Sequence, residues 1–319
     1  MTKFSHASLF SGLNHLLDIT MAPEYSAVCG YTERDLDAVF APELEGLDRD
    51  AIRDWYHGYN WLGEKVYNPV SILLLFRQRE FGAYWFETGL PRFLVNMLLK
   101  RRVSPVDLER MWANSHLLSG FEPGDIPAVA LLFRTGCLTI GGKTLVGGLP
   151  HYKLGYPNRE VRQSLNESLL RYLVKDGTRQ AANSLRLYEL LGKRDFEGMR
   201  NLFQAFFSSI PYEWYTNNDI ANYEGYYASV FYSYFAALGL DVTVEDSTSH
   251  GRLDMAVRFG RDVYLFEFKV VEMAPEGAAL AQLREKGYAD KYRDAASEIF
   301  LVGVEFSRET RNVVGFEVG

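Results

Sequence analysis

The sequence predicts an α+β protein, in which a mainly helical N-terminal region precedes a domain of strands and helices. Over residues 1–210, apolar residues recur at spacings of three and four, with short Pro or Gly breaks, as in amphipathic helices. From about Asn201 a long aromatic helix is followed by alternating, β-rich segments. We therefore expect a domain boundary near Ile210 and Pro211, with a helical region at 1–210 and a second domain at 211–319.

Composition and charge exclude several classes of protein. The 319 residues are 47% hydrophobic, which suffices for one large core or two smaller ones. No apolar run approaches the ~18 residues of a membrane span, and MTKFSHASLF lacks a secretory layout, so we expect a cytoplasmic protein without a membrane partner. The net charge of −7, from 34 basic and 41 acidic residues, argues against nonspecific coating of nucleic acid but allows a local basic groove.

Neither cysteine nor histidine suggests a metal site. Cys29 and Cys137 lie far apart without a CxxC motif, and the six histidines form no HExxH pattern. A disulfide framework, a zinc site and a metalloprotease are therefore not indicated.

The segment GCLTIGGKT is similar to a phosphate-binding loop but has the wrong spacing. The first glycine of such a loop would stand where Cys137 is, and no helical pattern follows Thr144. Its two short β-rich runs around Gly141 and Gly142 predict instead a β-hairpin near residues 137–149. We expect no ATP site in this chain.

The stretch GRLDMAVRFGRDVYLFEFKVVE predicts a hairpin that carries charges in a buried strand. A two-residue turn at Gly260-Arg261 would pair Phe259 with Asp262, which places Asp254 directly opposite Glu267. Because two facing carboxylates repel, replacing Asp254 by Ala is expected to keep or raise stability in the absence of metal.

Strand alternation places Lys269 on the same face as Glu267 and Asp254. Two carboxylates, a backbone carbonyl and waters suit Mg²⁺ or Mn²⁺, and a lysine can orient a water or neutralise phosphate charge. Glu224, on an aromatic helix expected from a cap at Asp219 to Gly239, is a candidate third acid. The alternative is a solvated edge-strand pair of Glu267 and Lys269, but the convergence of three acids and a lysine favours the metal site.

These residues resemble the PD-(D/E)XK nuclease superfamily, whose core is a mixed sheet flanked by helices. Asp254 of GRLD matches the Asp of the motif, and Glu267-Phe268-Lys269 matches (D/E)XK. Glu224 stands where many members have an acid on the first core helix, and Gln282 in ALAQLREKGYADKY matches a polar position on the next helix. The resemblance implies a restriction-endonuclease-like α/β domain.

The motif departs from its literal form in one place, since Leu253 replaces the proline before the aspartate. The Pro-Asp dipeptide varies among members of the superfamily, so its absence here weakens the resemblance little. The resemblance implies the Phe268 carbonyl as a further metal ligand.

The rest of the chain is similar to bacterial and archaeal proteins in which an AAA-like ATPase module precedes such a nuclease domain. The similar segments are SLFSGLNHLLDITMAPEYSAVCGYTE, WYHGYNW, VYNPVSIL, YWFETGLP and YKLGYPNREV. The P-loop part of that module is absent, so residues 1–210 are expected to correspond to its C-terminal part, in a shortened paralogue or an engineered segment. We therefore do not expect this chain to share the ATP hydrolysis of those proteins.

We expect a metal-dependent phosphodiesterase that acts on nucleic acid, with DNA as the expected substrate. Cations close to the motif or on the following helix could contact phosphates, namely Arg252, Lys286, Lys291 and Arg293. Their alternative is a solvated helix face paired with Glu285 and Asp290. The rival function is a noncatalytic interaction module, whose helical region binds a protein partner through the aromatic segment WYHGYNW.

Overall fold

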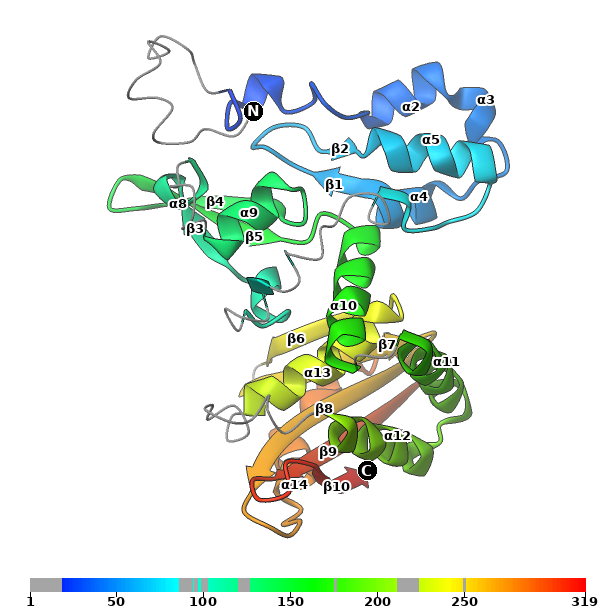
Figure 1. The fold of residues 1–319 in the computed structure, drawn as a ribbon, viewed down its shortest axis with the longest axis vertical. Coiled ribbons are helices and arrows are strands. Elements are labelled where there is room, and N and C mark those ends of the chain that lie inside the picture. Colours follow the sequence, from blue (N-terminus) through cyan, green and yellow to red (C-terminus); the bar gives the residue numbers. More distant parts are fainter. Residues whose placement is uncertain are drawn as a thin grey trace. The chain divides into compact units, whose positions relative to one another are not determined.

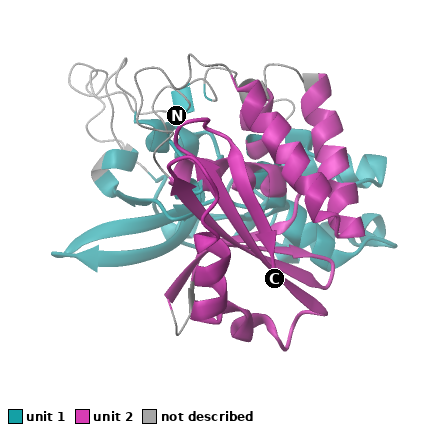
Figure 2. Ribbon diagram, turned by 90° about the horizontal axis from the view of Figure 1, so that it is seen from below, with its two compact units in different colours: residues 1–165 teal, residues 166–319 magenta. Residues whose placement is uncertain are grey.

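A computed structural model describes residues 19–85, 94, 97–98, 103–119, 127–174, 177–210, 224–248 and 251–319. The chain forms two compact units, residues 1–165 and 166–319 (Figure 2). The expected boundary near residue 210 lies later than this one. The difference arises because the helices just before residue 210 pack on the C-terminal sheet and so belong to the second unit.

Unit 1 contains short helices whose starts are set by their capping residues. Thr32 and Asp35 form a reciprocal capping box, and Asn68 caps a helix that begins with Pro69. The described helices are η1 (Pro23–Tyr25), α2 (Glu33–Val39), α3 (Ala41–Leu44), α4 (Arg49–Tyr56), α5 (Pro69–Gln78), η2 (Asp107–Glu109), α8 (Ser115–Ser119) and α9 (Ala128–Arg134). Helix α10 (Arg159–Val174) runs across the boundary of the two units.

The described residues of unit 1 also form two small sheets, of which the sequence predicted only one hairpin. Strands β1 (His57–Tyr59) and β2 (Val66–Tyr67) pair, and β3 (Trp112–Asn114), β4 (Thr139–Val146) and β5 (Leu149–Gly155) form a sheet of order β3-β5-β4. The runs of β1, β2 and β3 are two or three residues long, which is too short to show an alternation of apolar and polar residues.

The hairpin expected near residues 137–149 exists, but the predicted position of its turn is wrong. The turn lies at Gly147 and Gly148, whose φ angles are +59° and +81°. Gly141 and Gly142 lie inside β4, where the register shifts between Ile140 and Gly142. Glycine pairs suit bulges as well as turns, and the sequence did not distinguish the two.

The described residues of unit 2 form a mixed five-stranded sheet with helices on both faces (Figure 1). The strand order is β10-β9-β8-β7-β6, with β8 and β9 parallel and the other neighbours antiparallel. The strands are β6 (Asp241–Thr248), β7 (Gly251–Phe259), β8 (Asp262–Val271), β9 (Glu298–Ser307) and β10 (Val313–Val318). The helices are α11 (Gly177–Lys193), α12 (Phe196–Ser209), α13 (Glu224–Ala237), α14 (Ala278–Lys286) and η5 (Tyr288–Tyr292). The expected α+β class and the mixed, restriction-endonuclease-like sheet are thus confirmed.

The two faces of β8 pack against different helices. Phe266 and Phe268 contact Phe231 of α13, with ring centroids 6.0 and 5.1 Å away, and Phe231 stacks on Phe203 of α12 at 3.7 Å. On the opposite face Leu265 lies in the apolar cluster that includes residues of α14 and η5. The alternation predicted for β8 therefore holds, and its odd-numbered side chains face α14.

The β7–β8 hairpin has the predicted turn and register. Phe259 pairs with Asp262 and Met255 pairs with Phe266, around a turn in which Gly260 has φ +60°. Asp254 and Glu267 stand one position beyond the last of these pairs, and the negative charge of Asp254 acts on Glu267. The upstream helix α13 is described from Glu224, and the cap expected at Asp219 lies outside the described residues.

Candidate active site

Four charged side chains from three elements meet at one end of the unit 2 sheet. Glu267 of β8 is 1% exposed, whereas Glu224 at the start of α13 is 47% exposed. The Lys269 Nζ lies 3.6 Å from Glu267 Oε1 and 3.8 Å from Glu224 Oε2. Asp254, on the adjacent strand β7, is half-buried. The structure therefore brings together the three acids and the lysine expected from the sequence.

The backbone of β8 fixes the carboxylate of Asp254. Its Oδ2 accepts a hydrogen bond of 2.9 Å from the Phe268 N–H, just beyond the last paired residues of the two strands. Burial raises the pKa of Asp254 above its usual range, and this N–H opposes the shift. The side chain thus tolerates its charge through a hydrogen bond that the sequence did not reveal.

Glu267 holds a carboxylate where its environment opposes ionisation. Burial, and then the negative charge of Asp254, raise the pKa of Glu267 to about 7, while Lys269 lowers it. Its Oε1 accepts a hydrogen bond from the Gln282 Nε2 of α14. Its Oε2 is buried and makes no hydrogen bond with a described residue. A buried oxygen without a partner is costly and indicates a ligand that is supplied from outside the chain.

Two buried residues near these carboxylates were not predicted. Tyr288 of η5 donates from its hydroxyl to the Arg252 carbonyl at 3.1 Å, and burial followed by the charge of Glu267 raises its pKa. Glu305 of β9 is 2% exposed and accepts hydrogen bonds from backbone N–H groups at the start of α14. A single acid in the apolar run IFLVGVEF was the available signal for Glu305, and Tyr288 gave none.

The described residues suit a metal ion that keeps most of its waters. Among them, no three His, Cys, Asp or Glu side chains lie close enough to form a protein cage for a metal. Asp254 and Glu267 together offer two carboxylates, one with an unsatisfied oxygen. Mg²⁺ and Mn²⁺ accept one or two carboxylates and retain several waters, so the donor set fits these ions better than zinc.

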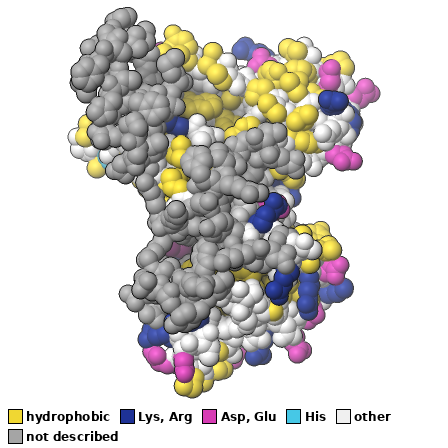
Figure 3. Space-filling model, in the orientation of Figure 1, with side chains coloured by type: hydrophobic (Ala, Val, Ile, Leu, Met, Phe, Trp, Pro, Cys, Tyr) yellow, Lys and Arg dark blue, Asp and Glu magenta, His cyan; other side chains and the backbone are white. Residues whose placement is uncertain are grey.

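Three of the four predicted phosphate-contacting cations are engaged in ion pairs. Exposed ion pairs are weak, so those of Arg252 and Arg293 do not prevent phosphate binding, whereas the Asp246 partner of Lys291 is only 11% exposed. The pairs are Arg252 with Glu245 at 3.0 Å, Lys291 with Asp246 at 2.5 Å, and Arg293 with Asp290 at 2.8 Å. Lys286, at the end of α14, has no such pair among the described residues. Basic and acidic side chains lie interspersed on the face seen in Figure 3.

Comparison with known proteins assigns this sheet to a family. A sequence model described as the PD-(D/E)XK nuclease superfamily matches residues 222–316, which span α13 to β10 and contain all four charged residues. Residues 222–316 form a PD-(D/E)XK nuclease superfamily domain. The expected resemblance is confirmed for this part of the chain, while the AAA-like module in residues 1–210 remains a prediction.

One relative extends over the whole chain. An uncharacterized protein of the vnfD 5' region of Azotobacter chroococcum mcd 1 is 60% identical over 318 residues, which cover 100% of this chain and 62% of that protein. The chain therefore spans less than two thirds of its relative. No solved structure matches the chain. Within the described residues, no helix is both long and apolar enough to cross a membrane.

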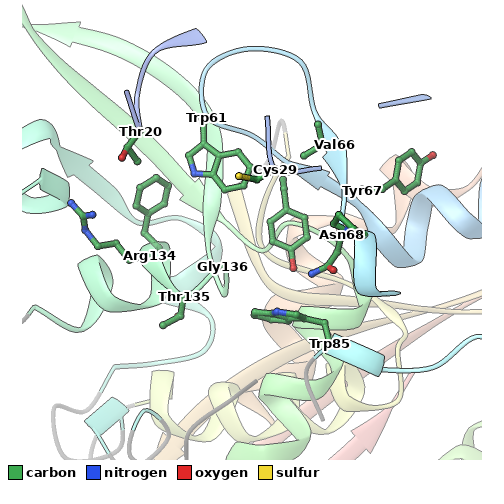
Figure 4. A pocket seen from close by; sticks show the side chains of 13 residues that line it. Thr20, Cys29, Trp61, Val66, Tyr67, Asn68, Trp85, Arg134, Thr135 and Gly136 are labelled. Carbon is green, nitrogen blue, oxygen red and sulfur yellow. The ribbon is translucent and has the colours of Figure 1, made fainter. Parts of the chain in front are cut away.

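Unit 1 contains a separate cavity lined by part of the aromatic segment WYHGYNW. The cavity has a volume of about 320 Å³, and Trp61, Trp85, Asn68 and Cys29 are among the side chains around it (Figure 4). Tyr59 also lines it but is only 6% exposed, and Tyr56 of the same segment is fully buried. Tyr56 and Tyr59 therefore belong to the core of unit 1, and none of Glu224, Asp254, Glu267 and Lys269 lines the cavity.

Proposed function

We propose that the PD-(D/E)XK domain is a divalent-metal-dependent phosphodiesterase that hydrolyses nucleic acid, with DNA as its substrate. The observation that carries the proposal is the buried Glu267 carboxylate, which has one unsatisfied oxygen, faces Asp254 and lies beside Lys269. A purely structural ion pair would leave neither a buried oxygen without a partner nor a second carboxylate beside it.

Each residue has a role that follows from its position. Asp254, Glu267 and the Phe268 carbonyl would hold Mg²⁺ or Mn²⁺, which supplies positive charge and a water of lowered pKa. Lys269 holds its ammonium against both Glu267 and Glu224, where it can orient the attacking water or neutralise the phosphate. Gln282 orients Glu267, and Glu224 contributes less because it is exposed. Arg252, Lys286, Lys291 and Arg293 are proposed to contact phosphates.

The test combines metal binding with cleavage. The wild-type chain is expected to melt at higher temperature with Mn²⁺ and to cleave single-stranded, duplex or branched DNA, because an ion bound only by the folded state stabilises it. Glu267→Gln should lose both effects. Glu285→Gln, which removes an exposed carboxylate from the neighbouring helix α14, is the matched control and should retain both. A wild type with neither effect would contradict the proposal.

The second candidate is a noncatalytic interaction module, favoured by the aromatic cavity of unit 1 (Figure 4). It predicts that a protein partner binds equally well to wild type and to Glu267→Gln, and that neither cleaves DNA. The activity of a longer protein that contains this chain, and the cytoplasmic location expected from the sequence, remain predictions.

A further inference from the structure

The first turn of α14 is held by a buried carboxylate from β9. Glu305 is 2% exposed, and its Oε2 accepts from the N–H groups of Glu276 and Gly277 at 2.6 and 3.1 Å. Its Oε1 accepts from the Ala279 N–H at 3.2 Å. The first N–H groups of a helix have no partner within the helix, so one side chain here satisfies three donors that would otherwise be unpaired.

A glycine on the same strand lets α14 approach the sheet closely. A Cβ at Gly303 would lie 2.4 Å from the backbone nitrogen of Leu280 and 2.8 Å from its Cα. Backbone atoms cannot move aside as a flexible side chain can, so any larger residue would push α14 away from β9. Glu305 and Gly303 thus form a docking position for α14, one by hydrogen bonding and one by its lack of a side chain.

This docking position lies directly beside the candidate catalytic strand. In the parallel register of β8 and β9, Glu267 pairs with Gly303 and Lys269 pairs with Glu305. Helix α14 carries Gln282, whose amide donates to Glu267 Oε1, so that Oε2 is the oxygen without a partner. The placement of α14 on β9 therefore decides which oxygen of Glu267 is engaged.

Glu305 acts through α14 rather than on a ligand directly. Both of its oxygens accept backbone N–H groups at the start of α14, so its carboxylate is already paired with that helix. Among the described residues, Lys269 forms ion pairs with Glu224 and Glu267 and forms none with Glu305.

We propose that Glu305 is a positioning residue: by fixing α14 on β9, it holds Gln282 against Glu267 and so presents the second oxygen of Glu267 to a divalent cation. The proposal rests on the proposed function, because that function supplies the cation. It adds a residue to the site that lies outside the motif and touches neither metal nor substrate.

The test is a double-mutant cycle read by Mn²⁺ titration calorimetry of the full chain. Gln282→Ala and Glu305→Ala should each weaken Mn²⁺ binding by about tenfold, the lower end of what residues that orient metal ligands contribute. In the Gln282→Ala background, Glu305→Ala should have no further effect, because the contact through which it acts is already gone. Gly303→Ala should weaken binding in the same way. If Glu305→Ala does not fold, Glu305→Gln and Gly303→Ala each take its place in the cycle with Gln282→Ala.

A buried carboxylate of unit 1 provides the matched control. Glu160 is fully buried and accepts from the Ser71 hydroxyl at 2.8 Å and from the Trp85 N–H at 2.7 Å. Glu160→Ala should lower thermal stability without changing Mn²⁺ affinity. Additive effects of Gln282→Ala and Glu305→Ala would overturn the positioning role and leave the proposed function intact.

A metal-free measurement separates failure of this proposal from failure of the proposed function. In ¹H–¹⁵N spectra without metal, the Gln282 side-chain amide is assigned by its loss in Gln282→Ala. Its resonances should shift in Glu305→Ala and remain unchanged in Glu160→Ala. A wild type that binds no Mn²⁺ would contradict the metal-dependent function, and the amide spectrum would then decide the role of Glu305: unchanged Gln282 resonances would overturn it.

Discussion

At the residue scale, the site depends on a carboxylate held in an environment that disfavours its charge. Glu267 is 1% exposed, and its pKa is raised to about 7, first by burial and then by Asp254. A pKa near neutrality means that the apo protein holds this proton more tightly than the unfolded chain does. Raised pKa values of this kind are typical of functional sites. A bound cation would favour the charged form of Glu267 and so offset the cost of burying it.

The pH dependence of stability tests this directly. The pKa of Glu267 is above its unfolded value of 4.5, so between about pH 4.5 and about pH 7 the folded state binds more protons, and the free energy of unfolding falls as pH rises. Relative to Glu267→Gln, the metal-free wild type should lose up to about 3 kcal/mol across this window and change little above it. Urea unfolding in a chelator, followed by circular dichroism, measures the difference. A constant difference from acid to neutral pH would contradict it.

Asp254→Asn tests the charge of Asp254 more directly than the Asp254→Ala variant that the sequence suggested. Its repulsion with Glu267 predicts that Ala would keep or raise metal-free stability, but Oδ2 also accepts from the Phe268 N–H at 2.9 Å. Phe268 is fully buried, so Asp254→Ala leaves its N–H without a partner, at about 1–3 kcal/mol. Asp254→Asn retains an acceptor and removes the charge. We therefore expect Asn to be more stable than Ala, and both to lose the Mn²⁺ melting shift; equal stabilities would contradict the role of this hydrogen bond.

Lys269 should separate metal binding from chemistry. Its Nζ lies 3.6 Å from Glu267 Oε1, but an ammonium cannot itself ligate a cation. Lys269→Met keeps the apolar stem, and at about pH 8, where Glu267 is ionised, it should retain the Mn²⁺ melting shift. Cleavage should fall by about 10²–10⁴-fold, as for loss of a positioned acid, base or charge-stabilising group. Loss of the melting shift would assign Lys269 to ion binding instead.

At the element scale, the β7–β8 hairpin was the part that sequence could predict. Alternation along both strands and the Gly260-Arg261 turn fixed its register, because a slip of one residue would have moved every side chain to the opposite face. The contact of Gln282 with Glu267 depends on the position at which α14 packs against β9. The residues between β8 and α14 show no local pattern that predicts this position. Strands β1, β2 and β3 of unit 1 escaped prediction for a related reason, since strands of two or three residues depend on tertiary contacts.

The turn of the β7–β8 hairpin can be tested by a substitution that disturbs no side-chain contact. Gly260 has φ +60°, and a Cβ there would meet nothing within 4 Å, so Gly260→Ala changes only the backbone preference. The left-handed conformation should make this variant less stable by about 1 kcal/mol, with metal binding retained because the register is unaltered. Arg261→Ala is the control and should lie within about 0.5 kcal/mol of wild type by the same urea unfolding. An unchanged stability of Gly260→Ala would indicate a different turn.

At the scale of the whole molecule, the superfamily match and the charge distribution constrain different parts of the chain. The match covers residues 222–316, whereas the net charge of −7 belongs to all 319 residues. An acidic protein gains little nonspecific affinity for nucleic acid from its overall field, so binding must come from local cations. A chain of this net charge is therefore expected to bind nucleic acid weakly and with a shallow dependence on salt concentration.

The place of the segment GGKT in the fold predicts that the chain binds no ATP. Gly142, Lys143 and Thr144 lie within strand β4, which continues to Val146 before a turn, so their N–H groups do not converge at the start of a helix as in a phosphate-binding loop. Calorimetric titration of the chain with ATP and Mg²⁺ should therefore show no saturable binding. The full-length Azotobacter chroococcum relative, of which this chain spans 62%, is the informative comparison. Micromolar binding by the chain itself would show that a nucleotide site exists without the glycine-rich loop, and the aromatic cavity around Trp61 would be the first place to mutate.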